Sequence, residues 1–494
     1  MGGPTAAVRC RVVRSAAAQR IVARHGRVDT LGMTNTIPVV GSAPLLGSLY
    51  DLNTTRMRAF FTRAYIEHGP VFEIRVLGQR LVVLAGPEAN RYASGSGRKS
   101  FGSHLAWGRL DRHFGVASSM ISVDGEEHTA MRRVEARAYT RAHFNATIDR
   151  SAAAAHEDLD AVSPGWLAVA PWCKRLVTEQ VARVAVSGSA RPLLDDLVRY
   201  VQLTLMAHVT RQRPPALMRF PRVARSQRRV WAMVDALVDE RRRTGPGDVP
   251  DLIDDVLAAA ALDPGRWGPT DVSVAALGAF IAGMDTAANT LAFAIWELVQ
   301  RPELVPDLVA EVDAALAGGI TAEALERMPG LVRFLFEVLR VHPIAPALER
   351  HLVTDVEFAG YHLPAGTHVI IATTVTHSLG DLFADPDRFD PDRFSRERGE
   401  HRTPGAYVPF GVGTHTCAGR GMAEGLLTLD AALLLHTLRF TKDPGYRLRQ
   451  IARPTPSPDN RFRINVLGRR TPDDQRAVSV PRTQADREAL TPRT

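Results

Sequence analysis

One long apolar stretch limits what this chain can fold into more than any other feature. Residues 270–301 are apolar almost throughout and are followed by Pro302, a pattern that predicts one helix of about nine turns through the core of a globular domain. Its middle reads Ala-Gly-Met-Asp-Thr at 282–286, and glycine, aspartate and threonine weaken a helix. The Thr286 hydroxyl can bond back to the Ala282 carbonyl and bend the axis. These residues thus lower the helix propensity in the middle of a segment that otherwise favours a helix, so we expect a functional site there.

The second feature is a glycine-rich segment around Cys417. Residues 410–419 read Phe-Gly-Val-Gly-Thr-His-Thr-Cys-Ala-Gly, and a helical apolar pattern starts near Ala418. Glycines let a large flat ligand approach the backbone closely. Amides that precede a helix can point at the sulfur and help to hold it as a thiolate. The segment therefore suits a haem iron ligand, and the alternative is a buried structural cysteine in a glycine-rich turn.

Two upstream segments predict a buried ion-pair network. Glu337 and Arg340 would share one face of a helix at i,i+3, and Arg393 lies in the sequence Pro-Asp-Arg-Phe at 391–394. A carboxylate between two guanidiniums can have its hydrogen bonds satisfied in the interior, because the planar arginine fork allows bidentate contact. A Glu-x-x-Arg spacing on its own is usually a solvated pair. Its position before the cysteine segment favours a structural role instead.

In their order and spacing, these segments resemble the signature of the cytochrome P450 family, and the resemblance covers residues 37–468. It implies the fold of that family, which is mainly α with small β-sheets (α+β) and has a long central helix over a buried haem. It also implies the cofactor haem b (iron protoporphyrin IX), bound through the Cys417 thiolate. The cofactor-binding residues that it implies are His128, Arg132, Arg350, Phe410, Gly411, His415, Cys417 and Gly419.

The haem propionates need basic partners, since buried carboxylates must be neutralised. His128 and Arg132 lie at i,i+4 and match the propionate-binding helix of the family in its bacterial form. Arg350 and His415 match two further propionate contacts. The network of Glu337, Arg340 and Arg393 would fix the haem loop.

The resemblance also gives the mid-helix residues a role. Thr286 would organise water and bound oxygen, and Asp285 would relay protons from solvent. The alternative is that Gly283 only allows helix packing and that the Thr286 hydroxyl only satisfies itself. The product of the reaction would be a small molecule that has gained one oxygen atom from O2.

Electrons must come from another protein, because the chain has no flavin or nicotinamide domain and no ferredoxin cysteine cluster. By resemblance the donors are a ferredoxin and a ferredoxin reductase. Helix geometry places Arg133 and Arg137 about 100° round the helix from Arg132, so we expect both to face outward near Arg420, where an acidic ferredoxin would dock.

The substrate is expected to be lipophilic, such as a terpenoid, a sterol or a fatty acid, because the candidate pocket walls are mostly apolar. By family position those walls are Phe114, Met120, Ile281, Ala282, Ile344 and Ala347.

Length and composition fit one large domain, which we expect to be a monomer. The 494 residues are 45% hydrophobic, and no linker divides residues 37–468. A strand hairpin is predicted at 71–76 and 81–84 around Gly78, and another strand at 366–371. Residues 1–36 are expected to be an N-terminal extension that is disordered or upstream of the true start. Residues 1–32 are rich in arginine and poor in acids, so they are either a targeting peptide or lie upstream of a true start at Met33. Residues 469–494 are expected to be a disordered tail.

Charge and cysteine content exclude some classes of protein. Residues 1–32 carry +5 and residues 469–494 carry +2, so only +1 of the formal +8 belongs to the rest, which argues against nucleic-acid binding. We expect no transmembrane segment. The three cysteines give no disulfide framework and fit a reducing compartment, so the expected location is cytoplasmic.

Three alternatives stay open. A haem-thiolate isomerase or peroxygenase would need no external electrons, and the pair Asp285 and Thr286 argues against it because those reactions need no such proton relay. A non-catalytic haem or ligand-binding protein would bind ligands without forming product. A structural protein without haem would be colourless.

Overall fold

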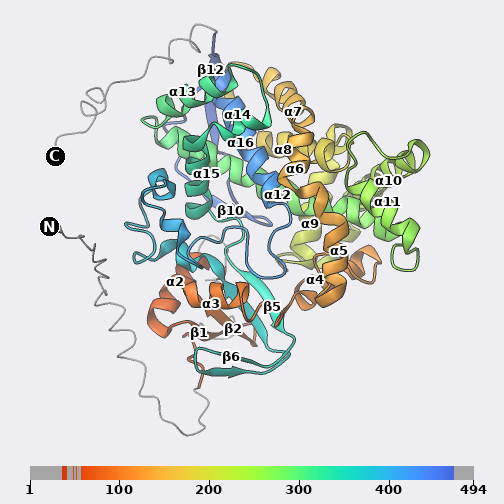
Figure 1. The fold of residues 1–494 in the computed structure, drawn as a ribbon, viewed down its shortest axis with the longest axis vertical. Coiled ribbons are helices and arrows are strands. Elements are labelled where there is room, and N and C mark those ends of the chain that lie inside the picture. The colour runs from red at the N-terminus through yellow and green to blue at the C-terminus, as the bar shows by residue number, and fades with distance from the viewer. Residues whose placement is uncertain (1–35, 42–47, 49–51, 53–56, 472–494) are drawn as a thin grey trace, which may run out of the picture.

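The computed structural model describes residues 36–41, 48, 52 and 57–471 of the chain (Figure 1). The expected N-terminal extension (1–36) and C-terminal tail (469–494), together with Cys10 and Met33, lie almost entirely outside these residues. The helices are α2 (Met57–His68), α3 (Gly86–Ser94), α4 (His104–Phe114), α5 (Gly125–Glu135), α6 (Arg141–Ala146), α7 (Ile148–Asp160), α8 (Val169–Ala185), α9 (Leu194–His208), α10 (Pro221–Thr244), α11 (Leu252–Leu262), α12 (Pro269–Gln300), α13 (Val305–Leu316), α14 (Ala322–Glu326), α15 (Pro329–Val341) and α16 (Arg420–Thr437).

The strands are short and form small sheets. They are β1 (Val71–Val76), β2 (Gln79–Ala85), β3 (Phe101–Gly102), β4 (Gly165–Ala168), β5 (Leu348–Leu352), β6 (Val356–Phe358), β7 (Tyr361–Leu363), β8 (His368–Ala372), β9 (Leu438–Lys442), β10 (Gln450–Ala452), β11 (Pro456–Pro458) and β12 (Arg463–Arg469). Short 3-10 helices lie at Ala136–Tyr139, Arg191–Leu193, Pro215–Arg219, Thr373–Ser378, Pro391–Phe394 and Glu400–Arg402. The expected class, mainly α with small β-sheets, is confirmed.

The largest sheet lies at one end of the molecule, beside α2 and α3, and most of the rest is helical, with small sheets such as the one that contains β12 (Figure 1). Its strand order is β1-β2-β8-β5-β3, with β2 and β8 parallel. The predicted hairpin is confirmed, because β1 and β2 pair in register from Val71↔Leu84 to Val76↔Gln79. Leu77 and Gly78 make the turn with φ of 49° and 80°, as a two-residue hairpin of this twist requires.

The helix α12 runs through the middle of the molecule (Figure 1), and the predicted long core helix is therefore confirmed. Phe280 and Phe293 on this helix are each 1% exposed. Its many small residues let α8 pack closely. A Cβ atom placed on Gly283 would lie 3.3 Å from Val181 Cγ2, which is tighter than most packed interiors allow.

By length and composition, α12 is also the one helix among the described residues that could cross a bilayer. The sequence analysis predicts no transmembrane segment, yet α12 has the length and composition of one. However, 67% of the apolar window is buried inside the fold. The helix is thus apolar because the domain packs around it.

Candidate active site

The Cys417 loop owes its shape to two glycines. Gly411 and Gly413 have φ of 77° and 80°, values that strongly favour glycine. A Cβ atom on Gly413 would also lie 2.8 Å from the Ala93 carbonyl oxygen, so this position has no room for a side chain. The backbone N–H of Cys417 donates to the Phe410 carbonyl at 3.0 Å. These contacts fix the cysteine just before α16, which starts at Arg420 instead of near Ala418.

The Cys417 thiol lies among protein groups that act on it in opposite directions. Its side chain is accessible, yet burial is the main influence on the thiol and raises its pKa. The Gly419 N–H, Arg132 and Arg420 lower that pKa, so the expected amide contact to the sulfur comes from Gly419. A coordinated metal cation would favour the thiolate far more strongly.

The other described cysteine differs in every respect that matters for ligation. Cys173 is 0% exposed within α8, and burial raises the pKa of its thiol well above the usual value. Such a cysteine is structural and chemically inert.

Four basic side chains from three parts of the chain gather beside the loop. His128 and Arg132 come from α5, Arg350 comes from β5 and His415 comes from the Cys417 loop. The rings of His128 and His415 are 4.1 Å apart between centroids. Burial and then the charges of His415 and Arg132 lower the pKa of His128 to about 4.

The carboxylate that hydrogen-bonds to a histidine of the basic cluster is Asp124. Asp124 accepts a hydrogen bond from His415 Nε2 at 2.9 Å and another from the Ser103 N–H at 2.8 Å. Arg350 is 8% exposed, and burial lowers the pKa of its guanidinium to about 10. Its Nη1 donates to the Glu349 carbonyl at 2.8 Å. A buried cation such as Arg350 favours an anionic partner.

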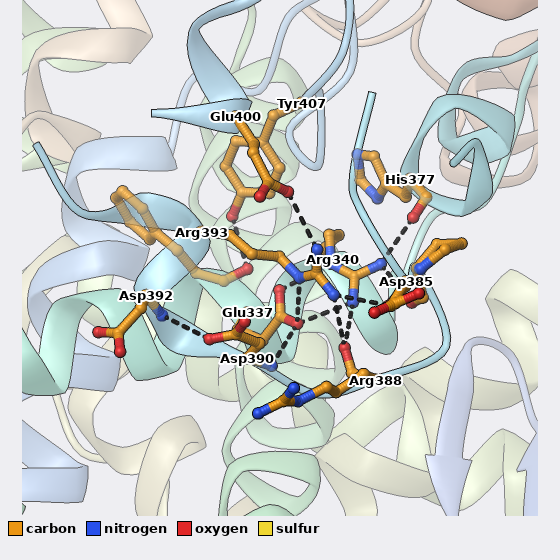
Figure 2. Close-up of polar contacts among 12 residues, drawn as sticks. Glu337, Arg340, His377, Asp385, Arg388, Asp390, Asp392, Arg393, Glu400 and Tyr407 are labelled. Atoms are coloured by element: carbon orange, nitrogen blue, oxygen red, sulfur yellow. Dashed lines mark hydrogen bonds and ion pairs between the residues drawn. The ribbon is translucent and has the colours of Figure 1, made fainter. Parts of the chain in front are cut away.

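The predicted ion-pair network is formed as expected (Figure 2). Arg340 binds Glu337 through two hydrogen bonds of 2.7 Å, and Arg393 Nε lies 3.3 Å from the same carboxylate. All three side chains are at most 1% exposed. The arginines also donate to backbone carbonyls between residues 377 and 388, so the network joins α15 to the segment that leads towards the cysteine loop.

The middle of α12 has the predicted backbone contact. The Thr286 hydroxyl donates to the Ala282 carbonyl at 2.7 Å, and both residues are exposed on a helix that is otherwise largely buried. Gly283 packs against Val181, so the alternative in which this glycine allows close helix packing applies to it. An exposed threonine on a core helix nevertheless faces a space in which a ligand can contact it.

Asp285 has partners that the sequence analysis missed. Lys174 Nζ on α8 lies 3.0 Å from Asp285 Oδ1, and Gln202 Nε2 on α9 donates to the same oxygen at 2.9 Å. Asp285 is only 2% exposed, and its Oδ2 has no hydrogen-bond partner among the described residues. Lysine is rare in this chain, and that rarity was the one sequence signal that could have pointed to Lys174.

Comparison with known proteins decides the family. The family model described as Cytochrome P450 matches residues 34–462, which is most of the chain. The protein belongs to the cytochrome P450 family. This P450 is 26% identical to Pentalenene oxygenase of Streptomyces avermitilis, over 87% of this chain and 96% of the relative. It is 28% identical to Cyclooctat-9-en-7-ol 5-monooxygenase of Streptomyces melanosporofaciens, over 84% and 91%.

Solved structures of P450s share its fold. A retinoic acid bound cyanobacterial CYP120A1 matches with a TM-score of 0.77 and 24% identity, covering 88% of this chain and all of that one. The heme domain of cytochrome P450DA matches with a TM-score of 0.78 and 22% identity, covering 90% and 100%.

Family membership makes this P450 a haem-thiolate monooxygenase, which is an oxidoreductase that uses O2, a lipophilic substrate and a redox partner. The described residues fit that cofactor. The accessible Cys417 lies on a fixed loop beside a cluster of two arginines and two histidines. The described carboxylates that act on this cluster are Asp124 and Glu349, and Glu349 is already paired with Arg211, so the cluster can accept the two propionates of a haem.

The expected substrate-pocket residues lie on several elements. Phe114, Ile281 and Ile344 are buried, Met120 packs against the main core, Ala347 packs under the large sheet, and Ala282 is exposed. Phe114 also lines a cavity of about 500 Å³ between α4, α10 and the start of α12. Trp231 on α10 meets Phe114 edge-on at 5.9 Å. The sequence analysis did not associate α10 with this region.

Arg137 faces outward as expected, since its side chain is 44% exposed. It is not free, however, because its Nε and Nη2 bind the Asp255 carboxylate of α11 at 2.7–3.0 Å. It also donates to the Pro250 carbonyl at 2.8 Å. Arg133 is exposed, and within the described part of the chain it has no ion-pair partner. Arg420 is 58% exposed and is paired with Glu424 within α16.

Proposed function

We propose that this P450 inserts one oxygen atom of O2 into a lipophilic small molecule such as a terpenoid, a sterol or a fatty acid. The observation that carries the proposal is the accessible Cys417 on its fixed loop beside the basic cluster. In this proposal Cys417 is the thiolate ligand of haem b, and Phe410, Gly411 and Gly419 shape the ligand loop. The haem, when bound, supplies the activation of O2.

The basic cluster would hold the propionates. Arg350 and Arg132 carry permanent charge and can each donate more than one hydrogen bond to a carboxylate. His128 and His415 would donate ring N–H groups. His415 Nε2 already donates to the Asp124 carboxylate, so we assign His415 the smaller share of propionate binding.

Thr286 and Asp285 would manage protons. The Thr286 hydroxyl is satisfied as a donor by the Ala282 carbonyl, which leaves its lone pairs free to accept from water or a bound ligand. Lys174 and Gln202 hold Asp285. A proton relayed by Asp285 therefore passes these two side chains, or is delivered after the Asp285 side chain rotates away from them. These contacts would also keep solvent out between turnovers.

The apolar pocket walls support a lipophilic substrate. Two relatives are named for oxidations of pentalenene and cyclooctat-9-en-7-ol, which supports a small-molecule substrate. We propose further that residues 37–468 form one monomeric domain that works in the cytoplasm, with electrons from a ferredoxin and its reductase.

A peroxygenase or isomerase is the alternative function, since it would use the same cysteine. The test is product formation from a panel of lipophilic compounds that first produce a haem spin-state shift. We expect product with ferredoxin, its reductase, NADPH and O2, and little product with hydrogen peroxide alone. Product from peroxide alone at the same rate would favour the peroxygenase, and spectral shifts without product under either condition would favour a non-catalytic binding protein.

A further inference from the structure

A second cleft is lined mainly by basic side chains. It has a volume of about 230 Å³. It lies between α4, the segment that follows α9, the start of β2 and the start of β8. Its lining residues are Gln79, His104, Leu105, Arg109, Arg112, Arg211 and His368. Five of these are arginine or histidine, and none is acidic, so the lining chemistry favours an anion.

Three carboxylates lie near these cations, namely Glu349, Asp111 and Asp124. Arg211 binds Glu349 at 2.8 Å. In the described chain, Arg109 and Arg112 have no carboxylate within ion-pair distance. The neighbouring Asp111 points inward, since it is 2% exposed and accepts a hydrogen bond from Ser119 Oγ at 2.6 Å. Two arginines on one helix are thus available to a ligand in the cleft.

The strand β5 connects this cleft to the proposed haem site. His351 on β5 lies opposite His368 of the cleft in the antiparallel register of β5 and β8. The preceding residue, Arg350, belongs to the basic cluster. Glu349, one residue earlier, contacts Arg211 from the opposite rim. Immediately before the strand lies the expected substrate wall that includes Ala347. At the usual rise of a strand, Ala347 and His351 are roughly 13 Å apart.

The size of the cleft limits what it can hold. Its volume is below the range of about 300–1,000 Å³ typical of pockets that enclose a whole small ligand, so it suits a charged head group and not a complete substrate. A ligand held there by its charged end could extend an apolar body along β5 towards the substrate wall.

We propose that this basic cleft binds the carboxylate of an amphiphilic acid whose apolar body enters the substrate pocket, with Arg109 and Arg112 as the determinants of specificity. This rests on the proposed function and narrows its substrate class from lipophilic compounds to lipophilic acids. A free inorganic anion is the competing source of negative charge, and the experiment below separates the two.

The test compares acids with their uncharged esters by isothermal titration calorimetry on the full-length, haem-loaded protein. The probes are lauric, retinoic and abscisic acid, each beside its methyl ester, and inorganic phosphate alone. We expect at least one acid to bind about tenfold more tightly than its ester, as one to two exposed charge contacts would give. The double variant Arg109→Gln/Arg112→Gln should lower the affinity for that acid to the affinity for the ester and leave ester binding unchanged.

A matched control removes the same charge elsewhere. Arg225 and Arg228 on α10 are exposed and line neither described cleft, so Arg225→Gln/Arg228→Gln should keep the preference for the acid. Equal affinities for every acid and ester, no binding of any probe, or equal losses in both double variants would overturn the inference. Phosphate binding that depends on Arg109 and Arg112, without a preference for acids, would also overturn it in favour of a free-anion site. None of these results alters the turnover test of the proposed function, so the two can fail separately.

Discussion

Asp285 and Asp430 are both 2% exposed, but the neighbouring side chains give them different properties. Asp285 has a cationic partner in Lys174. Among the described residues, the hydrogen-bond partner of Asp430 on α16 is an amide, Gln180 Nε2 at 2.6 Å. Burial is the main reason that the pKa of Asp430 rises to about 8. At neutral pH, Asp430 is therefore protonated in the folded protein, whereas the unfolded chain would ionise it.

The first prediction concerns the pH dependence of stability. The folded pKa of Asp430 lies above its ordinary value of 3.8, so its contribution is fully present below about pH 4 and is lost as the pH rises towards about 8. Asp430→Asn keeps an acceptor for Gln180 and removes the titration. The measurement is the free energy of unfolding in urea at several pH values in this window. As the pH rises, this free energy should fall less steeply in Asp430→Asn than in wild type, by about 1.4 kcal/mol per pH unit. Identical slopes in variant and wild type would show that Asp430 is ionised in the fold.

The second prediction separates the role of Thr286 from haem binding. Thr286→Ala removes a hydroxyl that contacts only carbonyls of its own helix, so the haem content per protein should stay the same. If Thr286 organises proton delivery, reducing equivalents should be diverted to hydrogen peroxide at the expense of product. Thr286→Ser, which keeps the hydroxyl, should restore coupling. Tightly coupled product formation in Thr286→Ala would remove the residue from the mechanism.

At the scale of elements, the Glu337 network joins α15 to the long segment before the cysteine loop. Glu337 also accepts the Asp390 N–H at 2.8 Å, just ahead of the 3-10 helix Pro391–Phe394. Tyr407 donates its hydroxyl to the Phe336 carbonyl at 3.0 Å, and the same segment then continues to Phe410. Hydrogen bonds to one helix thus hold a stretch that has little regular structure of its own.

The third prediction follows from the burial of this network. Glu337→Gln leaves the Arg340 guanidinium in the interior without its carboxylate, and leaves Arg393 with Glu400 at 3.0 Å. Breaking a buried pair in this way costs about 3–5 kcal/mol. Thermal unfolding should show a marked loss of stability, and the purified protein should contain less haem. Asp160→Asn is the control, because the Asp160 carboxylate is 64% exposed and pairs with Arg469 at the surface. That control should change stability by less than about 1 kcal/mol, and a similar small change in Glu337→Gln would contradict a structural role for the network.

At the scale of the whole molecule, positive charge is found in two functional places. One is the basic cleft between α4 and the large sheet. The other lies near Cys417, where Arg132 and Arg420 act on the thiol and Arg133 is exposed beside Arg132. With Arg137 occupied by Asp255, Arg133 and Arg420 are the remaining candidates for docking a ferredoxin.

The fourth prediction tests that docking face. Arg133→Glu/Arg420→Gln should slow reduction by an acidic ferredoxin at low salt by about tenfold or more and flatten its salt dependence, because charge steering acts mainly on the association rate. Substrate binding should be unaltered. Arg225→Glu/Arg228→Gln on α10 is the matched control and should reduce at the normal rate. Equal rates in the double variant and in wild type would place the docking site elsewhere.

The sequence predicted the features that depend on local geometry. The Thr286 bond to Ala282 and the i,i+3 contact of Glu337 with Arg340 both follow from spacing along the chain. It could not predict partners brought together by packing. Asp255 lies on another helix from Arg137, and no periodicity links the two.

The same limit applies to Asp285 and to the basic cleft. Lys174 and Gln202 reach Asp285 from two different helices. The cleft combines residues from α4, the segment after α9 and two strands, and each of these residues in isolation is typical of a solvated surface.

The central claim is that Cys417 provides the thiolate ligand of a haem, and the spectrum of the ferrous carbonyl complex tests it most directly. The wild-type protein should show the red-shifted Soret band of thiolate ligation, and Cys417→Ser should lose it. Cys173→Ala, which removes the buried cysteine of α8, should keep the band. A Cys417→Ser protein that retains the red-shifted band would contradict the account.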